Sequence, residues 1–364
     1  MYDKVNYQSK QKICKYYNTP NGCYLNNKCK FIHQKLYFSY ENKIPNNKYK
    51  KNENNINKHS NFNNPQKNSI KNIKCVRIYN EEEKISYISL FPSGNLICVT
   101  FNKSIKIYDK DFILQNIIRN AHQNPITLVN IKDEENFVTS SWEGNIKFWK
   151  KEKKNQYEIK QKINKAHNGN INTIIYYSNE ILISSSDDGI IKIWELNKYK
   201  KYNSILVLNH SAKLFSILLL NDLHILLSSG HFGIKIWNIN NYECIINLKG
   251  RFYYDCNIMK RINKDNVILN GMEKLLKIFS ISEKQIIKLI DLSFDCFCIH
   301  IVEEKGIFLI GGNSNDILIF RNDDYKFIYK IKNANEKWLE LFIGLKEDLF
   351  LTYWSDQTIK IWSF

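Results

Sequence analysis

The sequence predicts an all-β fold that is built from a repeat of 41 to 45 residues and preceded by a short cysteine-rich segment. Three observations lead to this prediction. Seven short runs alternate apolar with polar residues and end in an aromatic residue, which is typical of β-strands. A histidine precedes three of these aromatic residues by the same interval of 27 positions. From Ile73 onward the composition changes from polar and Asn-rich to this alternating pattern.

The composition describes a folded, basic chain. The 364 residues are 43% hydrophobic, which is enough to bury a core and excludes a wholly disordered chain. The formal net charge is +17, and residues 1–72 carry +11 of it because they hold 14 Lys and three acidic residues. This asymmetry indicates a polyanionic partner for the N-terminal segment, although a general bias toward Lys and Asn fits it as well.

No segment is expected to enter a membrane. The longest apolar run, residues 214–229, is interrupted by Asn221, Asp222 and His224, and the first 14 residues lack the apolar core of a secretory signal. We therefore expect an intracellular protein of the nucleus, the cytoplasm or both. Its cysteines are then mostly reduced, so clustered cysteines indicate a metal site.

Residues 10–36 contain such a cluster, with the spacing C-x8-C-x5-C-x3-H. The four expected ligands are Cys14, Cys23, Cys29 and His33. Three thiolates and one imidazole complete the tetrahedron that Zn²⁺ prefers in structural sites, so no position stays open for a catalytic water. A segment this short cannot build a stable apolar core, and bound zinc would supply its folding energy. The spacing resembles that of the CCCH zinc-finger family.

This resemblance implies that the segment binds single-stranded RNA, by stacking bases on aromatic rings and pairing phosphates with basic side chains. Phe31 stands at the family's usual stacking position. The other residues expected to contact RNA are Lys15, Tyr16, Tyr17, Lys28 and Lys30. Two features depart from the family pattern: Leu25 stands where an aromatic residue is common, and the segment has no Arg. The alternative is a small zinc-stabilised fold whose aromatic residues pack around the metal.

Residues 37–72 are predicted to be a disordered basic linker. Positions 42–72 hold 12 Asn and 7 Lys, and such a composition cannot bury enough apolar surface to offset the entropy of ordering.

The repeat occupies residues 73–364. Its seven alternating runs end at Tyr108, Trp149, Trp194, Trp237, Phe279, Phe320 and Trp362. Each run alternates Ile with Lys, from which we expect Ile and the aromatic residue on one buried face and Lys on the other. His122, His167 and His210 precede Trp149, Trp194 and Trp237 by 27 residues, with a polar turn in between.

The period and the His-to-Trp spacing resemble the WD40 repeat family. This resemblance implies a seven-bladed β-propeller. It also implies a hydrogen-bonded tetrad in each well-preserved blade, which joins a His, a Ser or Thr, a turn Asp and a Trp. The complete set consists of His167, Ser184, Asp188 and Trp194, and a near match consists of His122, Thr139, Glu143 and Trp149. The other blades keep only parts of the set.

The chain leaves the seventh blade one strand short, because Trp362 lies two residues before the last residue, Phe364. Residues 73–79 precede the first blade and read as a strand. We expect them to supply the outer strand of the last blade and so to close the ring.

The propeller is expected to bind proteins through aromatic and arginine side chains near the turns. The residues proposed for this role are Phe101, Trp142, Phe232, Arg251, Tyr253 and Trp354. The alternative is that several of these side chains pack inside the blades. The sequence contains no glycine-rich phosphate loop, GxSxG or HExxH motif, so we expect neither an enzyme nor a small-molecule substrate.

Two functions remain open. The first is a non-enzymatic RNA-binding adaptor, in which the finger binds RNA while the propeller recruits proteins; the order of the two domains resembles eukaryotic zinc-finger WD40 proteins. The second is a pure protein scaffold or a substrate-recognition subunit whose zinc finger is structural.

Overall fold

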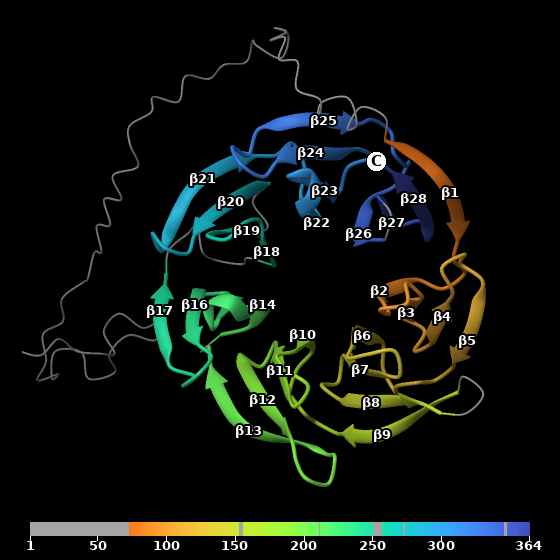
Figure 1. The fold of residues 1–364 in the computed structure, drawn as a ribbon, viewed down its shortest axis with the longest axis vertical. Coiled ribbons are helices and arrows are strands. Elements are labelled where there is room, and N and C mark those ends of the chain that lie inside the picture. Colours follow the sequence, from red (N-terminus) through yellow and green to blue (C-terminus); the bar gives the residue numbers. More distant parts are fainter. Residues whose placement is uncertain (1–72, 153–155, 211, 250–256, 272–273, 346–347) are drawn as a thin grey trace, which may run out of the picture. The chain divides into compact units, whose positions relative to one another are not determined.

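The computed structural model describes residues 73–364, apart from 153–155, 211, 250–256, 272–273 and 346–347. These residues form seven antiparallel sheets of four strands each, arranged as a ring (Figure 1). This confirms the all-β, seven-bladed propeller that the sequence predicts. The zinc finger expected at 10–36 and the linker expected at 37–72 lie outside the described residues.

Blades 1 to 3 follow one another along the chain, and each begins with its innermost strand. Blade 1 contains β2 (Ile85–Leu90), β3 (Leu96–Thr100), β4 (Ile105–Tyr108) and β5 (Leu114–Ile118). Blade 2 contains β6 (Ile126–Ile131), β7 (Asn136–Ser141), β8 (Ile146–Lys151) and β9 (Tyr157–Ile163). Blade 3 contains β10 (Ile171–Tyr176), β11 (Ile181–Ser186), β12 (Ile190–Leu196) and β13 (Tyr202–Asn209).

Blades 4 to 6 repeat this plan. Blade 4 contains β14 (Leu214–Leu220), β15 (Ile225–Gly230), β16 (Gly233–Asn238) and β17 (Cys244–Leu248). Blade 5 contains β18 (Ile258–Arg261), β19 (Asn266–Asn270), β20 (Leu275–Ser280) and β21 (Gln285–Asp291). Blade 6 contains β22 (Cys296–Val302), β23 (Ile307–Gly312), β24 (Ile317–Arg321) and β25 (Phe327–Ile331). Two 3₁₀ turns, Asn221–Leu223 and Glu303–Lys305, join first and second strands in blades 4 and 6.

Blade 7 combines strands from both ends of the described chain. It contains β26 (Leu339–Gly344), β27 (Leu349–Trp354), β28 (Thr358–Ser363) and β1 (Lys74–Asn80). Strand β1 pairs antiparallel with β28, with Tyr79 opposite Ile359, and a bulge lies between Cys75 and Arg77. The ring is thus closed by hydrogen bonds between segments far apart in the sequence, which removes the open edge that β28 would otherwise present.

Both faces of each blade are buried, because each blade lies between two neighbours. On β8, Phe148 packs into the same cluster as Trp194 of blade 3. The next residue, Trp149, points the other way and packs with Ile107 of blade 1. Successive residues of a strand point to opposite faces. The third strand of each blade therefore directs its terminal aromatic residue toward the preceding blade and its isoleucines toward the following one.

The expectation that Ile and the aromatic residue share a face is wrong. In a strand, side chains two positions apart share a face, so Lys goes with the aromatic residue. The ammonium nitrogen of Lys192 lies 5.7 Å from the ring centroid of Trp194. Lys147 lies 5.9 Å from Trp149 in the same way, and it is 8% exposed. The repeated Lys is a half-buried or buried structural residue rather than part of a solvated face.

Neighbouring blades are also joined near the centre of the ring. The carbonyl oxygen of the first residue of an inner strand accepts a hydrogen bond from a side chain of the preceding blade. Ser86 donates to Ile126 at 2.5 Å, and Asn172 donates to Leu214 at 2.6 Å. The same link joins Thr127 to Ile171, Asn270 to Cys296 and Cys298 to Leu339.

Candidate functional site: the tetrad face of the propeller

The turns between the second and third strands of the blades lie on one face of the ring, which we call the tetrad face. The turn of blade 3, at Asp187–Gly189, is typical. Gly189 has a φ of 79°, and a Cβ atom there would lie 2.8 Å from the carbonyl oxygen of Ala212. Only glycine fits this turn without strain, and the turn positions the side chain of Asp188.

Blade 3 contains the complete hydrogen-bonded set. His167 lies 3.0 Å from a carboxylate oxygen of Asp188 through Nδ1 and 2.8 Å from the Ser184 hydroxyl through Nε2. The indole N–H of Trp194 donates to the same hydroxyl at 2.8 Å. Burial raises the pKa of the Asp188 carboxyl, but hydrogen bonds from His167 and the Asn168 N–H outweigh this effect and leave it below its usual value. The network fixes the turn to the sheet behind it.

Blade 2 contains only part of the set. His122 and the indole of Trp149 each lie 2.8 Å from the hydroxyl of Thr139. Glu143 instead accepts a hydrogen bond from Asn145 at 2.8 Å. Among the described residues, His122 Nδ1 has no hydrogen-bond partner. Burial, with Lys147 nearby, lowers the pKa of His122 to about 3, so its ring is neutral at physiological pH.

Blades 4 and 7 show two further variants. In blade 4, burial lowers the pKa of His210 to about 4, and Trp237 donates to the Ser228 hydroxyl at 2.8 Å. In blade 7, Asn335 stands at the histidine position and donates to Asp356 at 2.9 Å. The indoles of Trp354 and Trp362 both donate to Thr352 at 2.8 Å.

Blade 1 has a different buried polar network, which the sequence reasoning missed. Lys106 forms an ion pair with Glu81 at 2.9 Å, and both side chains are about nine-tenths buried. The hydroxyl of Tyr108, which stands at the tryptophan position, donates to the other oxygen of Glu81. The signal was present in the sequence: three consecutive acids at 81–83 precede a blade whose tryptophan is replaced by tyrosine.

The aromatic residues proposed to bind proteins are only partly exposed. Trp142 and Phe232 are each 54% exposed, and Phe101 is half-buried. The prediction that Trp354 contacts a protein partner is wrong, because its side chain is fully buried beside Thr352. Arg251 and Tyr253 lie outside the described residues. So do the four predicted zinc ligands and the six residues proposed to contact RNA.

The structure brings four aromatic side chains together along consecutive blades of the tetrad face. Phe297 and Trp338, from blades 6 and 7, meet edge to face with centroids 6.3 Å apart. Phe101 and Trp142, from blades 1 and 2, meet in the same way at 6.1 Å. We call these four residues the aromatic arc. Sequence reasoning missed Trp338, although it occupies a position that is polar or proline in other repeats, such as Lys84 and Pro125.

An ion pair lies between the two halves of the aromatic arc. The ammonium group of Lys84 in blade 1 lies 3.4 Å from Glu340 of blade 7 and 5.4 Å from the ring centroid of Phe101. Trp338 and Phe297 are 55% and 43% exposed. The arc is therefore an apolar surface with its own charged pair, held by the rigid blades beneath it.

Two further observations limit the chemistry of the described residues. They contain no group of three or more His, Cys, Asp or Glu side chains arranged to hold a metal ion. In the same part of the chain, no helix has both the length and the apolar character needed to cross a membrane.

The comparisons with known proteins agree with this architecture. Residues 159–195 match the family model described as WD domain, G-beta repeat. The match begins in β9 and covers β10, β11 and most of β12, so it contains all four residues of the complete tetrad. No curated protein matches the chain significantly. The protein therefore carries a WD40 repeat within a seven-bladed β-propeller.

Proposed function

We propose that this protein is a non-enzymatic adaptor, whose propeller recruits protein partners while its N-terminal segment holds one zinc ion and binds single-stranded RNA. The observation that carries the first part is the aromatic arc. Exposed tryptophan and phenylalanine side chains on a rigid surface are favoured anchors of protein interfaces, because they bury a large apolar area at little entropic cost. The WD40 propeller itself suggests a protein-interaction scaffold.

The recruitment of proteins is tested by a double substitution in the aromatic arc. We expect Trp142→Ala with Trp338→Ala to remove a defined set of proteins from an affinity purification, measured by quantitative mass spectrometry. Both side chains are more than half exposed, so the fold is retained and thermal melting checks this. Phe327→Ala is the matched control, because Phe327 is 54% exposed but lies on the outer strand β25. An unchanged set of partners would remove the arc from the proposal.

The RNA-binding part rests on the spacing of Cys14, Cys23, Cys29 and His33 and on the basic, aromatic residues around them. Native mass spectrometry of the whole protein should find one zinc ion per chain, and Cys14→Ser should lose it. Short single-stranded RNAs should shift in a mobility assay at low salt, and less at high salt because phosphate contacts release counterions. Phe31→Ala should weaken the shift; binding that is indifferent to Phe31 would contradict the proposed stacking.

The second candidate is a pure protein scaffold, or the substrate-recognition subunit of a larger assembly, with a structural zinc finger. The absence of Arg from residues 1–72 favours it, because guanidinium stacking and bidentate phosphate contacts are then missing from that segment. Crosslinking in cells distinguishes the two candidates. Recovery of RNA that depends on Cys14 and His33 supports the adaptor, whereas recovery of protein partners alone supports the scaffold.

A further inference from the structure

A groove opens between blades 2 and 3 on the face of the ring opposite the tetrads. Its volume is about 390 Å³, and its apolar walls include Phe148, Tyr176, Leu196 and Tyr202. Lys150, near the end of β8, and Lys200, in the turn before β13, also line it, one from each blade. We call it the blade 2–3 groove. Its volume lies at the lower end of the range of ligand pockets.

Contacts between the two blades hold the groove open in one shape. The rings of Phe148 and Tyr202 stack with centroids 4.6 Å apart and planes 9° from parallel. The Gln161 side chain accepts a hydrogen bond from the Tyr202 N–H at 2.8 Å and donates one to its carbonyl oxygen at 2.7 Å. Lys132 donates to the carbonyl oxygen of Asn179 at 2.6 Å, and its ammonium nitrogen lies 5.8 Å and 6.0 Å from the ring centroids of Tyr176 and Tyr202. A ligand entering this groove would not need to order its walls first.

The charge of the lining is strongly one-sided, with four lysines and a single carboxylate, that of Glu135. Two of the lysines already have partners. Lys132 is bonded as described, and Lys160 forms ion pairs with Glu152 at 2.6 Å and Glu158 at 3.1 Å. Lys150 and Lys200 are exposed, and neither forms an ion pair with another described residue. Lys150 also lies near Glu134, Glu135 and Glu152, which line the adjoining hollow with it, but no carboxylate of the described residues is bonded to it. Both ammonium groups can therefore meet an acidic ligand.

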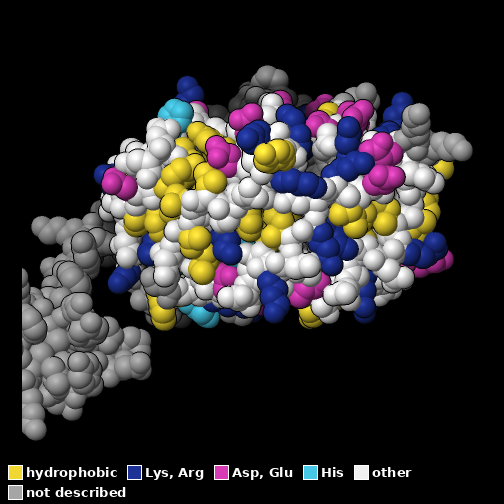
Figure 2. Space-filling view, turned by 90° about the horizontal axis from the view of Figure 1, so that it is seen from below, with side chains coloured by type: hydrophobic (Ala, Val, Ile, Leu, Met, Phe, Trp, Pro, Cys, Tyr) yellow, Lys and Arg dark blue, Asp and Glu magenta, His cyan; other side chains and the backbone are white. Residues whose placement is uncertain are grey.

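The same side of the rim is seen in Figure 2, which views the ring from below the position of β9 and β13 in Figure 1. Hydrophobic side chains form an interrupted band at mid-height, and above it Lys and Arg side chains gather among Asp and Glu side chains. Exposed aliphatic residues of the outer strands contribute to the apolar surface of the rim, among them Ile159 of β9 and Ile205 and Val207 of β13. The rim thus adds exposed apolar side chains to a groove that is itself lined by lysines.

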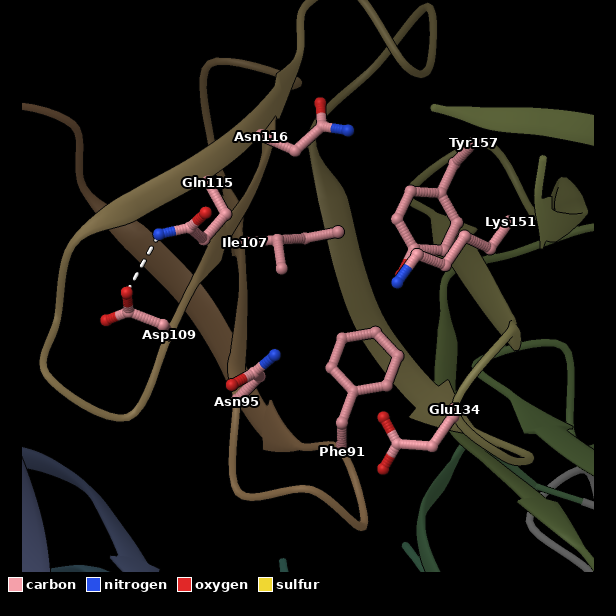
Figure 3. A pocket seen from close by; sticks show the side chains of 9 residues that line it. All are labelled: Phe91, Asn95, Ile107, Asp109, Gln115, Asn116, Glu134, Lys151 and Tyr157. Atoms are coloured by element: carbon pink, nitrogen blue, oxygen red, sulfur yellow. Dashed lines mark hydrogen bonds between the residues drawn. The ribbon is translucent and has the colours of Figure 1, made fainter. Parts of the chain in front are cut away.

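The equivalent cavity between blades 1 and 2 shows that this charge does not follow from the fold. Figure 3 shows that cavity, which is smaller, at about 220 Å³, and is lined by Phe91 and Tyr157. Its charged residues are Asp109, Glu134 and Lys151, so acids outnumber bases there. The two sites share their architecture and differ in charge, and the difference belongs to the sequence of blades 2 and 3.

We propose that the blade 2–3 groove binds a short acidic peptide segment of a partner protein. An apolar side chain of the peptide enters between Tyr176 and Leu196, and flanking carboxylates pair with Lys150 and Lys200. The desolvated apolar contact supplies affinity, and the two ion pairs fix the direction and choice of peptide. This site lies on the other face from the aromatic arc, so it is independent of the function proposed above.

A peptide fits this groove better than a nucleic acid does. Bases bind single-strand sites by stacking on free ring faces, but the faces of Phe148 and Tyr202 are occupied by each other. Both side chains are less than a tenth exposed, so a base cannot insert between them. Burial, with Glu180 and Asp133 nearby, raises the pKa of Tyr202 to about 12, and its hydroxyl stays protonated as a donor. The nearby Tyr199 is 72% exposed, so a base could stack on its ring outside the groove.

The test uses the whole protein and a fluorescent 12-residue peptide of Asp and Glu with a central photoactivatable leucine. Binding of the peptide is measured by fluorescence anisotropy. We expect Lys150→Glu with Lys200→Glu to weaken binding at least tenfold. Lys110→Glu with Lys284→Glu is the control of equal charge, because these exposed lysines lie in blades 1 and 5 in the same turn as Lys200 does in blade 3, and it should change binding less than twofold. Replacing the central leucine by glycine should weaken binding as well, whereas replacing the carboxylates by amides should abolish it.

Crosslinking by the photoactivated leucine then locates the peptide. Crosslinks to residues 176–202 support the proposal. Crosslinks confined to residues 1–72, or equal losses in both double variants, would show general attraction to a basic chain and overturn it. A 12-nucleotide oligouridine is tested in parallel. If it binds and loses affinity with Tyr199→Ala while the peptide does not bind, the site takes nucleic acid and the proposal is wrong. None of these outcomes depends on Trp142 or Trp338, so the two proposals fail separately.

Discussion

Lys192 donates a hydrogen bond of 2.6 Å to the carbonyl oxygen of Ala166, the residue before the tetrad histidine of blade 3. The same bond recurs at the same spacing of 26 residues in three other blades. It joins Lys147 to Ala121, Lys235 to Asn209 and Lys360 to Ala334. The repeated lysine thus connects the third strand of a blade to the link that carries its histidine or, in blade 7, its asparagine. It supports the tetrad face from behind.

The first prediction concerns this lysine. Lys192→Met keeps the apolar stem but leaves the Ala166 carbonyl oxygen without its donor, and it removes the cation from the Trp194 ring. We expect the free energy of unfolding in urea to fall by about 1–3 kcal/mol. Lys198→Met is the control, because Lys198 is exposed, and its loss should be within about 0.5 kcal/mol. Equal effects would show that the bond to Ala166 contributes nothing.

The second prediction concerns the buried ion pair of blade 1. Glu81→Leu leaves the ammonium group of Lys106 buried without its carboxylate, and this should cost about 3 kcal/mol in chemical denaturation. Adding Lys106→Leu should restore part of the lost stability, because replacing both charges by apolar groups avoids the unpaired ion. A double variant that is less stable than Glu81→Leu would argue that Lys106 acts through other contacts.

The third prediction concerns acidity. The pKa values of His122 and His210 are lowered to about 3 and about 4, against about 6.5 in an unfolded chain. Between these values the unfolded state binds more protons, so stability falls as the pH falls below about 6.5. At pH 5 each histidine should cost about 2 kcal/mol relative to pH 7.5. The melting temperature measured from pH 7.5 to pH 5 should show this decline.

Asn335, at the histidine position of blade 7, suggests the matching variant. His122→Asn removes one titrating group, so its melting temperature should depend less steeply on pH than that of the native protein, whatever its absolute value. A slope that does not change with this substitution would mean that His122 is not among the groups that titrate on unfolding.

The fourth prediction concerns the closing strand. Deleting residues 73–80 removes β1 and exposes the backbone edge of β28. We expect the melting temperature, followed by circular dichroism, to drop by about 10 °C or more. Ile78→Thr is the control, because Ile78 is 59% exposed and its backbone pairing with Lys360 is unaffected by the side chain. A deletion that melts like the intact chain would contradict the closure.

The propeller could be predicted because its repeat is marked by residues that the fold needs. The interval from His167 to Trp194 reflects a buried network that a turn and two strands must complete, so it is visible in the sequence. The prediction that the repeated lysines face away from the aromatic residues is wrong for a physical reason. An alternating pattern usually means one buried and one solvated face, but a blade has neighbours on both faces, and Lys192 is satisfied there by a carbonyl oxygen.

The candidate surfaces were harder to predict. Trp142 is exposed, as the sequence predicts, whereas Trp354 is the last residue of β27 and is buried in the core between blades 6 and 7. Sequence position near a turn does not decide between these outcomes, because the direction of the side chain depends on the residue's place in the turn. The blade 2–3 groove could not be predicted from the sequence, because Lys150 and Lys200 are brought to one opening only by the packing of two blades.

The WD domain match at 159–195 begins in the outer strand of one blade and ends in the third strand of the next. The sequence repeat therefore contains the fourth strand of one blade and the first three strands of the next, so its boundaries differ from those of a blade by one strand. The link between these two sheets therefore falls inside the sequence unit. Among the described strands, β28 and β1 are the one pair of neighbours within a sheet that are not consecutive along the chain. Gain or loss of one whole sequence repeat during evolution would thus change the number of blades in the ring by one and leave the pairing of β28 with β1 intact.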